Sequence, residues 1–473
     1  MINTVPIHQQ TNTKYRLLLD VTISATTDLN TGIQRVVRNI SQNAEAISNE
    51  LGIECVPVVC HGDQLSPVGF DGRAGIDERI FRSVRDGWMN CHKGIASLLS
   101  RFNSKAGTGY LSFLSRLRKL FVPKTLVRAT GNFYRHWTGK TIQFANNDIL
   151  VLLDASWDLP LDHLIQLSSE KQVPLVTVVY DLIPVLHPQF HHQQLREVFS
   201  RWLDTVIDRS DLMIGISKTV QNDLDAYIQD RDRLKFKPKE GETDSRCQLD
   251  HFRLGSDFAK SNTATREGSS ELPANADGLK RDQYYLCVGT LEPRKNHRFL
   301  LDSFEQLWAE GSDCQLAIVG KVGWMCDEVF ERISNHPQLN RRLFYFDNVS
   351  DTQLEEFYRD AKALVFPSIV EGFGLPIVEA FQNQIPVLAS DTNIHREVAG
   401  DDATFFSLDD PANLSRMIAE IESGSLKLRI PDRASISWSE SCREFLGKIC
   451  NFIASKSSES EHSEDERERR LAA

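Results

Sequence analysis

The segment EGFGLPIVE contains two glutamates, Glu371 and Glu379, on either side of a glycine-rich turn. Gly372 and Gly374 carry no side chains, so the backbone N–H groups of the turn can approach a ligand closely. Carboxylate oxygens accept hydrogen bonds from hydroxyl groups. The segment therefore predicts a site for a hydroxyl-bearing ligand, in which Glu379 can accept from both hydroxyls of a ribose and Glu371 from a hydroxyl of a second sugar.

The strand before this segment and the helix after it decide which of its groups can contact a ligand. The apolar run ALVFPS predicts a buried strand before it, and Pro376 is expected to be the first residue of a following helix. Glu379 then lies about one turn into the helix, whose positive end faces the loop. Ordinary helix capping is the alternative interpretation of these glycines and glutamates.

A second candidate site is the segment VGTLEPRKN. Its strand should end at Gly289, and the following loop brings Arg294, Lys295 and Asn296 to the start of a helix near His297. Two cations together with the free N–H groups of a helix N-terminus suit a diphosphate. Together with Glu371 and Glu379, these cations favour ligand binding over capping.

Two further candidates follow apolar strands nearer the N-terminus. Ligands of open parallel sheets bind beyond the carboxyl ends of the strands. At such ends TTDLNTGIQR supplies Gly32 and Arg35, and VVYDLIP supplies Tyr180 and Asp181. Gly32 permits a tight loop close to a cleft, and Asp181 is expected to face the same cleft.

Composition disfavours several other classes. The net charge of −11 argues against general nucleic-acid binding, because phosphate neutralisation drives that affinity. Nine cysteines without a Cys-x-x-Cys pair indicate reduced thiols rather than zinc or disulfides. Neither the histidines 187, 191 and 192 nor the aspartate pairs near residues 223–232 favour a metal, and no Gly-x-Gly-x-x-Gly follows a strand. We therefore expect no metal and no cofactor.

Short apolar strands alternate with helical patterns along most of the chain, which predicts α/β domains with parallel sheets covered on both faces. One such domain is expected at residues 14–255, a polar interdomain linker at 256–282 and a second doubly wound domain at 283–430. A C-terminal helix at 431–455 should pack on the body, and the polar residues 456–473 are expected to be disordered.

The first domain contains a basic insert at about residues 87–147, which has no Asp or Glu and ten Lys or Arg residues. Leu111, Leu114, Leu117 and Phe121 recur there at near-helical spacing beside the cations. A basic amphipathic helix of this kind suits an anionic membrane surface. A helix that packs its apolar face on the domain, with solvated cations, remains the alternative.

Membrane crossing and export are not expected. No apolar run approaches the roughly 18 to 20 residues that a spanning helix needs. The first residues, MINTVPIHQQTNTKYR, lack the apolar core of a signal peptide. The sequence therefore predicts a cytoplasmic protein, with peripheral association at the inner face of the plasma membrane if the basic insert binds lipid.

At these motifs the chain resembles glycosyltransferase family 4, the retaining enzymes with the GT-B fold of two facing Rossmann-like domains. The resemblance rests on the Glu-x7-Glu motif at Glu371–Glu379, on VGTLEPRKN, on IVGKVGW and on Ser437-Trp438. It is specific from about Tyr284 to Trp438, fainter before that, and absent from the basic insert. Among family members the chain is most similar to bacterial mannosyl- and rhamnosyltransferases of O-antigen or capsule synthesis.

The resemblance implies sugar transfer from a nucleotide diphosphate-sugar, with GDP-mannose weakly preferred, to a glycan or lipid-linked glycan. The C-terminal domain would hold the donor and the N-terminal domain would face the acceptor. The implied catalytic residues are Asp181, Arg294, Lys295 and Glu371. The implied donor-binding residues are Gly32, Arg294, Lys295, Glu371, Gly372, Phe373, Gly374, Leu375 and Glu379.

Two departures from the family pattern affect this assignment. Thr290 stands where many members have Arg, so the diphosphate charge would rest on Arg294 and Lys295. Tyr180 stands before Asp181 where many have His, so no catalytic histidine is carried over. A catalytically inactive sugar-nucleotide-binding scaffold and a sugar-nucleotide epimerase of the same fold remain alternatives.

Overall fold

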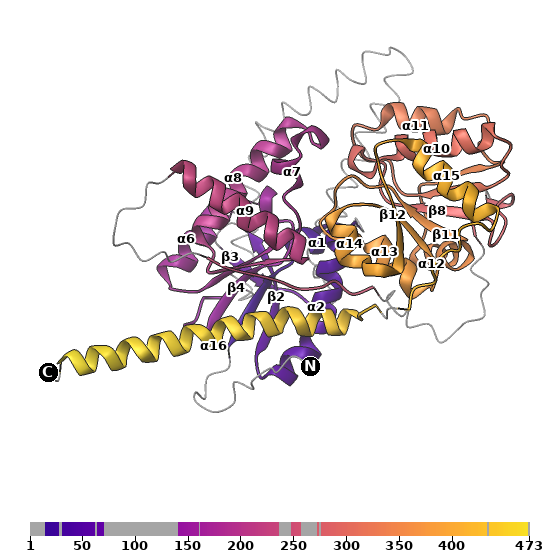
Figure 1. The fold of residues 1–473 in the computed structure, drawn as a ribbon. Helices are drawn as coiled ribbons and strands as arrows, with labels where there is room; N and C mark the ends of the chain where they lie inside the picture. The colour runs from indigo at the N-terminus through magenta and orange to yellow at the C-terminus, as the bar shows by residue number, and fades with distance from the viewer. Residues whose placement is uncertain are drawn as a thin grey trace, which may run out of the picture. The chain divides into compact units, whose positions relative to one another are not determined.

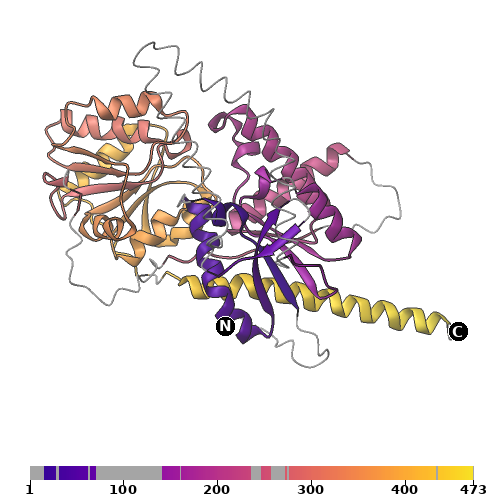
Figure 2. The same ribbon diagram turned by 180° about the vertical axis from the view of Figure 1, so that it is seen from behind.

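The protein was analysed as a computed structural model, shown as a ribbon in Figure 1 and from behind in Figure 2. By contacts, the chain divides into two compact units, residues 1–177 and 178–473. The structure describes residues 15–27, 31–61, 64–70, 141–159, 161–235, 247–256, 272–273, 276–432 and 435–471.

The first half of the chain alternates strands and helices as the sequence predicts. Leu17, Leu18 and Leu19 of the first strand are fully buried, as expected for a continuous apolar run in a sheet covered on both faces. The elements are β1 (Arg16–Asp20), α1 (Thr22–Thr26), α2 (Gly32–Leu51), β2 (Glu54–His61), β3 (Gln64–Pro67), β4 (Asp148–Leu152), η1 (Ser156–Asp158), α6 (Asp162–Glu170), β5 (Leu175–Val179), α7 (Ile183–Leu186), η2 (Pro188–Phe190), α8 (Gln193–Arg209), β6 (Leu212–Gly215), α9 (Lys218–Lys235) and β7 (Gln248–His251).

A second alternation follows in the C-terminal half. Its elements are β8 (Tyr284–Val288), η4 (Pro293–Lys295), α10 (His297–Ala309), β9 (Gln315–Val319), α11 (Asp327–Ser334), β10 (Leu343–Phe346), α12 (Asp351–Asp360), β11 (Ala363–Phe366), α13 (Leu375–Gln382), β12 (Val387–Ser390), α14 (Asn393–Ala399), η5 (Gly400–Asp402), β13 (Ala403–Phe406), α15 (Pro411–Glu422) and α16 (Trp438–Leu471).

The strands form two sheets. One has seven strands in the order β3-β2-β1-β4-β5-β6-β7, and the other has six in the order β10-β9-β8-β11-β12-β13. Neighbouring strands of the six-stranded sheet pair in parallel. Two doubly wound α/β sheets are thus confirmed, and strand order reverses next to β8, where the chain passes from β9 and β10 to β11.

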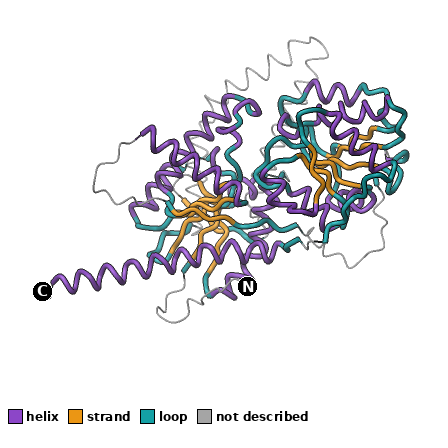
Figure 3. Tube along the Cα trace, in the orientation of Figure 1, coloured by secondary structure: helices purple, strands orange, loops and turns teal. Residues whose placement is uncertain are grey.

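Helices cover both faces of the six-stranded sheet, as the purple helices and orange strands of Figure 3 show. Alternate side chains of each strand reach one face. Tyr285 and Cys287 of β8, with Leu316 and Ile318 of β9, join one core together with residues of α10 and α15. This core fixes the strands whose carboxyl ends carry the candidate site.

Some elements differ from the sequence predictions. The seven-stranded sheet is not wholly parallel, because β3 pairs antiparallel with β2. The apolar run RLLLDVTI predicts a strand over residues 16–23, but β1 stops at Asp20 and Thr22–Thr26 forms α1. β3, β7 and β13 were not predicted, since QLSP, QLDH and ATFF are too short to give a pattern.

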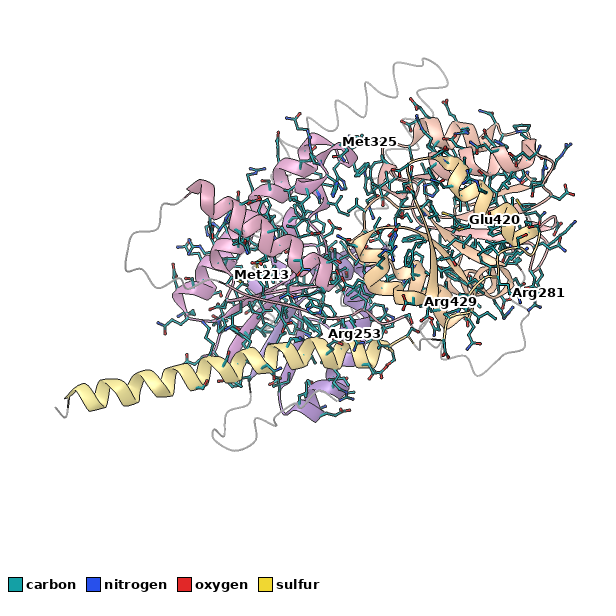
Figure 4. The ribbon with its side chains drawn as sticks, in the orientation of Figure 1. Met213, Arg253, Arg281, Met325, Glu420 and Arg429 are labelled. Carbon is teal, nitrogen blue, oxygen red and sulfur yellow. The ribbon has the colours of Figure 1, made fainter. Side chains whose placement is uncertain are left out.

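The C-terminal helix is longer than predicted. α16 extends to Leu471, beyond the predicted end at residue 455, and the disorder expected for residues 456–473 stays a prediction. Glu and Arg dominate residues 464–470 and are good helix formers, which a composition argument for disorder overlooks. α16 is tied to the second unit where Arg253 pairs with Glu444 at 3.0 Å, and Figure 4 labels Arg253 beside this helix.

The basic insert lies mostly outside the described residues, as do residues 257–271 and 274–275 of the predicted linker. Among the residues that the structure does describe, no helix has the length and apolar character needed to cross a membrane.

Candidate functional site

The loop after β8 has the predicted course. β8 ends at Val288, and α10 begins at His297. Gly289 has a φ of 155° and lies against Lys295, since a Cβ placed there would be 3.4 Å from Lys295 Cε. Asn296 takes a left-handed conformation, with φ 58°, between the short 3₁₀ helix η4 and α10. The loop thereby brings the side chain of Lys295 back against Gly289 at the end of the strand.

The second loop runs from β11 to α13. α13 begins at Leu375, so the prediction that Pro376 is its first residue is off by one position. The N-cap residue Gly374 has a φ of 109°, which side chains rarely tolerate. The glycine is therefore required by the backbone that starts α13.

Glu371 joins the two loops. Its carboxylate lies 2.5 Å from Lys295 Nζ and also pairs with Arg294 Nη1. Arg294 Nη1 also donates to the carbonyl of Val370 at 3.3 Å, and Arg294 Nη2 lies 2.6 Å from an oxygen of Glu292. The structure thus brings together Arg294, Lys295 and Glu371, the three residues expected at the diphosphate and the sugar.

These charges shift one another's protonation. Burial alone would raise the pKa of Glu371, but Arg294 and Lys295 outweigh it and lower that pKa to about 2. Burial disfavours the Arg294 cation, yet Glu371, Glu292 and Asp181 raise its pKa above the ordinary value. Burial raises the pKa of both Asp181 and Glu292, against the opposing effect of the cations. Arg294 therefore stays charged in a site that also holds three carboxyl groups.

Glu379 is the fifth residue of α13 and is 1% exposed. Its Oε2 accepts a hydrogen bond from the Tyr358 hydroxyl at 2.7 Å. The Tyr358 contact fixes the carboxylate one helical turn from Gly374. This placement agrees with the predicted position in the helix.

Gly372 makes a close contact that the sequence did not predict. A Cβ at this position would lie 2.1 Å from the carbonyl oxygen of Tyr180 and 3.2 Å from Asp181 Cβ. The Ser217 hydroxyl donates to the Gly372 carbonyl at 2.8 Å. The absent side chain thus gives room to the backbone of Tyr180, whereas the sequence suggested room for a ligand.

Asp181 lies in the same group. It follows β5, and its Oδ1 accepts from the backbone N–H of Ile183 at 2.9 Å. Its carboxyl group is close enough to Arg294, Lys295 and Glu371 for their charges to affect its pKa. Asp181 therefore lies near the cations within the second unit.

The remaining predicted residues lie in two places. Phe373 is buried and Leu375 is half-buried, beside the glycines already described. Gly32 is the exposed first residue of α2, and Arg35 lies one turn further, both in the first unit.

Three neighbours of the cations were not predicted from the sequence. Glu292 is 3% exposed and pairs with Arg294. Phe366, the last residue of β11, has its ring centroid 5.1 Å from Lys295 Nζ and 5.0 Å from the ring of His395. Glu292 stands within VGTLEPRKN, and its charge in the loop after a buried strand was the available signal. His395 is distant in sequence and had no such signal.

Chemically, the site offers two fixed cations, a carboxylate shared between them and a second carboxylate at the start of a helix. A diphosphate matches the cations, and hydroxyl groups match Glu371 and Glu379. No cluster of three or more His, Cys, Asp or Glu suited to a metal occurs within the described ranges.

Comparison with known proteins agrees with this chemistry. Residues 272–436 match the family model described as "Glycosyl transferases group 1". The matched range contains both loops of the site, from β8 to α13.

Three curated relatives are similar to this chain. The serotype-specific mannosyltransferase WbdA of Escherichia coli is 32% identical over 385 residues, which are 76% of this chain and 44% of WbdA. The O-antigen chain mannosyltransferase B of E. coli is 35% identical over 229 residues, or 48% and 55% of the two chains. The O-antigen chain mannosyltransferase RfbU of Salmonella typhimurium is 29% identical over 157 residues, or 33% and 41%. The chain thus spans about half the length of these relatives.

Proposed function

The chain carries a domain of the glycosyl transferases group 1 family at residues 272–436, and we propose that it is a retaining glycosyltransferase. It moves mannose or a similar hexose from a nucleotide diphosphate-sugar to a glycan or lipid-linked glycan in bacterial polysaccharide synthesis. Mannose is the first sugar to test because the relatives are named mannosyltransferases. GDP-mannose is the donor that we expect.

The observation that carries the proposal is that Arg294 and Lys295 both pair with the carboxylate of Glu371, each with a different oxygen. In transfer, the bond between the anomeric carbon and the leaving phosphate oxygen breaks and negative charge grows on the diphosphate. Preorganised cations at that position stabilise the departing group. Arg294 and Lys295 have this role, and we propose that they fulfil it without a metal ion.

The second half of the reaction forms the new glycosidic bond on the same face of the sugar. The acceptor oxygen bonds to the anomeric carbon, and its proton passes to an oxygen of the leaving phosphate. No covalent enzyme intermediate forms. Glu371 accepts from a hydroxyl of the transferred sugar, Glu379 accepts from the ribose, and Asp181 lies on the acceptor side of the cations.

The experiment is product analysis with the full chain. The protein is first screened for thermal stabilisation by GDP, UDP, dTDP and their sugars, because a bound ligand raises apparent stability. The selected donor is then incubated with O-antigen or capsule oligosaccharides. We expect an acceptor longer by one or more α-linked sugars. Binding without turnover would indicate the inactive scaffold, and an altered free sugar nucleotide would indicate the epimerase.

We also propose that the protein acts in the cytoplasm, at the inner face of the plasma membrane, through the basic insert at 87–147. Ten Lys or Arg residues without an acidic residue support this proposal. Co-sedimentation with anionic liposomes tests it. Equal binding by the wild type and by a variant with Arg116, Arg118 and Lys119 changed to Glu would contradict it.

A further inference from the structure

Glu292 is a buried carboxylate beside the cations, and nothing in the proposed reaction uses it. It precedes Pro293 of η4, and its side chain is 2% exposed. Oε1 lies 2.6 Å from Arg294 Nη2, and within the described residues Oε2 is buried without a hydrogen-bond partner. A buried carboxylate with an unsatisfied oxygen costs free energy. Within the part of the chain that the structure describes, Arg294 is the one ion-pair partner of Glu292.

Arg294 is therefore held by two carboxylates that belong to different loops. Glu371 belongs to the loop between β11 and α13, and it contacts Lys295 as well as Arg294 Nη1. Glu292 belongs to the same loop as Arg294, two residues before it, and contacts only Nη2. A diphosphate that approaches Arg294 and Lys295 can take over the hydrogen bonds now made to Glu371. The bond to Glu292 does not need to break.

The guanidinium is planar, so a bond at Nη2 fixes the direction in which Nη1 points. Misplacement of a catalytic cation by about 1 Å can cost roughly a hundredfold in rate. The carbonyl of Val370 and the pair with Glu292 remain as anchors of Arg294 when Glu371 turns to a sugar hydroxyl.

We propose that Glu292 is a positioning residue that fixes the guanidinium of Arg294 for the second phosphate of the donor. This inference rests on the proposed function, because it requires a diphosphate at Arg294. Burial raises the pKa of Glu292 while Arg294 and Lys295 oppose that rise, which agrees with a carboxylate whose charge depends on its pairing.

The test compares a nucleoside diphosphate with its monophosphate. The base is the one that the thermal screen selects from GDP, UDP and dTDP. Calorimetry then measures the affinities of the wild type, Glu292→Gln and Glu292→Ala for both nucleotides. Glu292→Gln keeps the shape of the side chain and one hydrogen bond, so it carries the test even if Glu292→Ala does not fold.

We expect Glu292→Gln to weaken binding of the diphosphate by about tenfold and to leave binding of the monophosphate within about twofold, because the proposal assigns the second phosphate to Arg294. A purely structural role of Glu292 would lower the affinity for both nucleotides alike, and that result would overturn the proposal. Glu328→Gln is the matched control, because Glu328 forms an exposed ion pair with Arg298 in the same domain. It should change neither affinity.

A double-mutant cycle locates the effect. If Glu292 acts through Arg294, then Glu292→Gln adds no further loss in an Arg294→Ala background. Independent, additive losses would overturn the proposal. A wild type that binds none of the diphosphates would instead refute the proposed function itself.

Discussion

Lys295 Nζ lies 2.5 Å from Glu371 Oε1, and this pair links the loop after β8 to the loop after β11. The Glu371 carboxylate pairs with the two cations that, in the proposed function, bind the diphosphate of the donor. Donor binding must therefore exchange one anion for another at Lys295 and Arg294. Glu371 is then available for a sugar hydroxyl, which couples diphosphate recognition to sugar recognition.

The position of Glu379 predicts discrimination of ribose from deoxyribose. We expect the wild type to bind a ribonucleoside diphosphate about tenfold or more tightly than its 2′-deoxy form, because a hydrogen bond to a carboxylate is lost. Glu379→Ala should bind both forms equally. Calorimetry with GDP and 2′-deoxy-GDP measures both affinities. An undiminished preference for the ribose form in Glu379→Ala would show that Glu379 does not bind the ribose.

Tyr358→Phe is the companion variant, since Tyr358 donates to Glu379 at 2.7 Å. It should reduce the ribose preference only partly, because the carboxylate remains in place.

The contact between Gly372 and Tyr180 predicts that no side chain is tolerated at position 372. A Cβ would lie 2.1 Å from the Tyr180 carbonyl oxygen, and backbone cannot yield as a flexible side chain does. Gly372→Ala should lower transfer activity at least about tenfold by displacing the loop that carries Glu371. Activity is measured at several donor concentrations.

Gly424→Ala provides the comparison. Gly424 has a φ of 77° and open space around it, so the variant should lose about 1 kcal/mol of stability and keep its activity. Wild-type activity in Gly372→Ala would show that the contact with Tyr180 does not constrain the loop.

The carboxyl group of Asp20 in the first unit predicts a pH-dependent stability. It is fully buried at the end of β1, and its Oδ1 accepts from Thr22 N at 3.0 Å and from Cys60 Sγ at 3.4 Å. Burial and the nearby Asp154 raise its pKa to about 6. The folded state thus binds this proton more tightly than the unfolded state, whose Asp pKa is about 3.9.

Stability is therefore lost as the pH rises from about 4 to 6, by on the order of 3 kcal/mol. Asp20→Asn removes the ionisation and keeps an acceptor oxygen. The free energy of unfolding of the variant, relative to wild type, should increase between pH 4 and pH 6 and then level off. Urea unfolding at pH 4, 5, 6 and 7 measures the free energies of both proteins. A difference between them that stays constant with pH would show that the pKa of Asp20 is not raised.

The sequence alone predicted much of this site, for a physical reason. Charged residues that follow a continuous apolar strand stand out, and both loops of the site directly follow such strands. Arg294, Lys295 and Glu371 were therefore predicted to act together, although 76 residues separate Lys295 from Glu371. The parallel order of β8 and β11 brings their carboxyl ends to one edge.

Other features depend on packing that no local pattern reveals. The requirement for Gly372 comes from Tyr180, which is remote in sequence. His395 reaches Phe366 from α14. The short strands β3, β7 and β13 have no periodicity of their own and exist because a neighbouring strand offers hydrogen bonds.

Independence from metal ions is a further prediction, because Arg294 and Lys295 supply the positive charge at the leaving group. Transfer by the full chain should be the same in EDTA as in Mg²⁺ or Mn²⁺. Loss of activity in EDTA that a divalent ion restores would assign the leaving-group charge to a metal.

The central claim is that Lys295 and Arg294 bind the diphosphate of a sugar nucleotide. Titration of the selected donor into wild type and Lys295→Ala tests it most directly, with Lys362→Ala as the control because Lys362 pairs with Glu422 instead. We expect saturable binding by the wild type and the control, and affinity at least about tenfold lower in Lys295→Ala. Equal affinity in all three proteins would contradict the account.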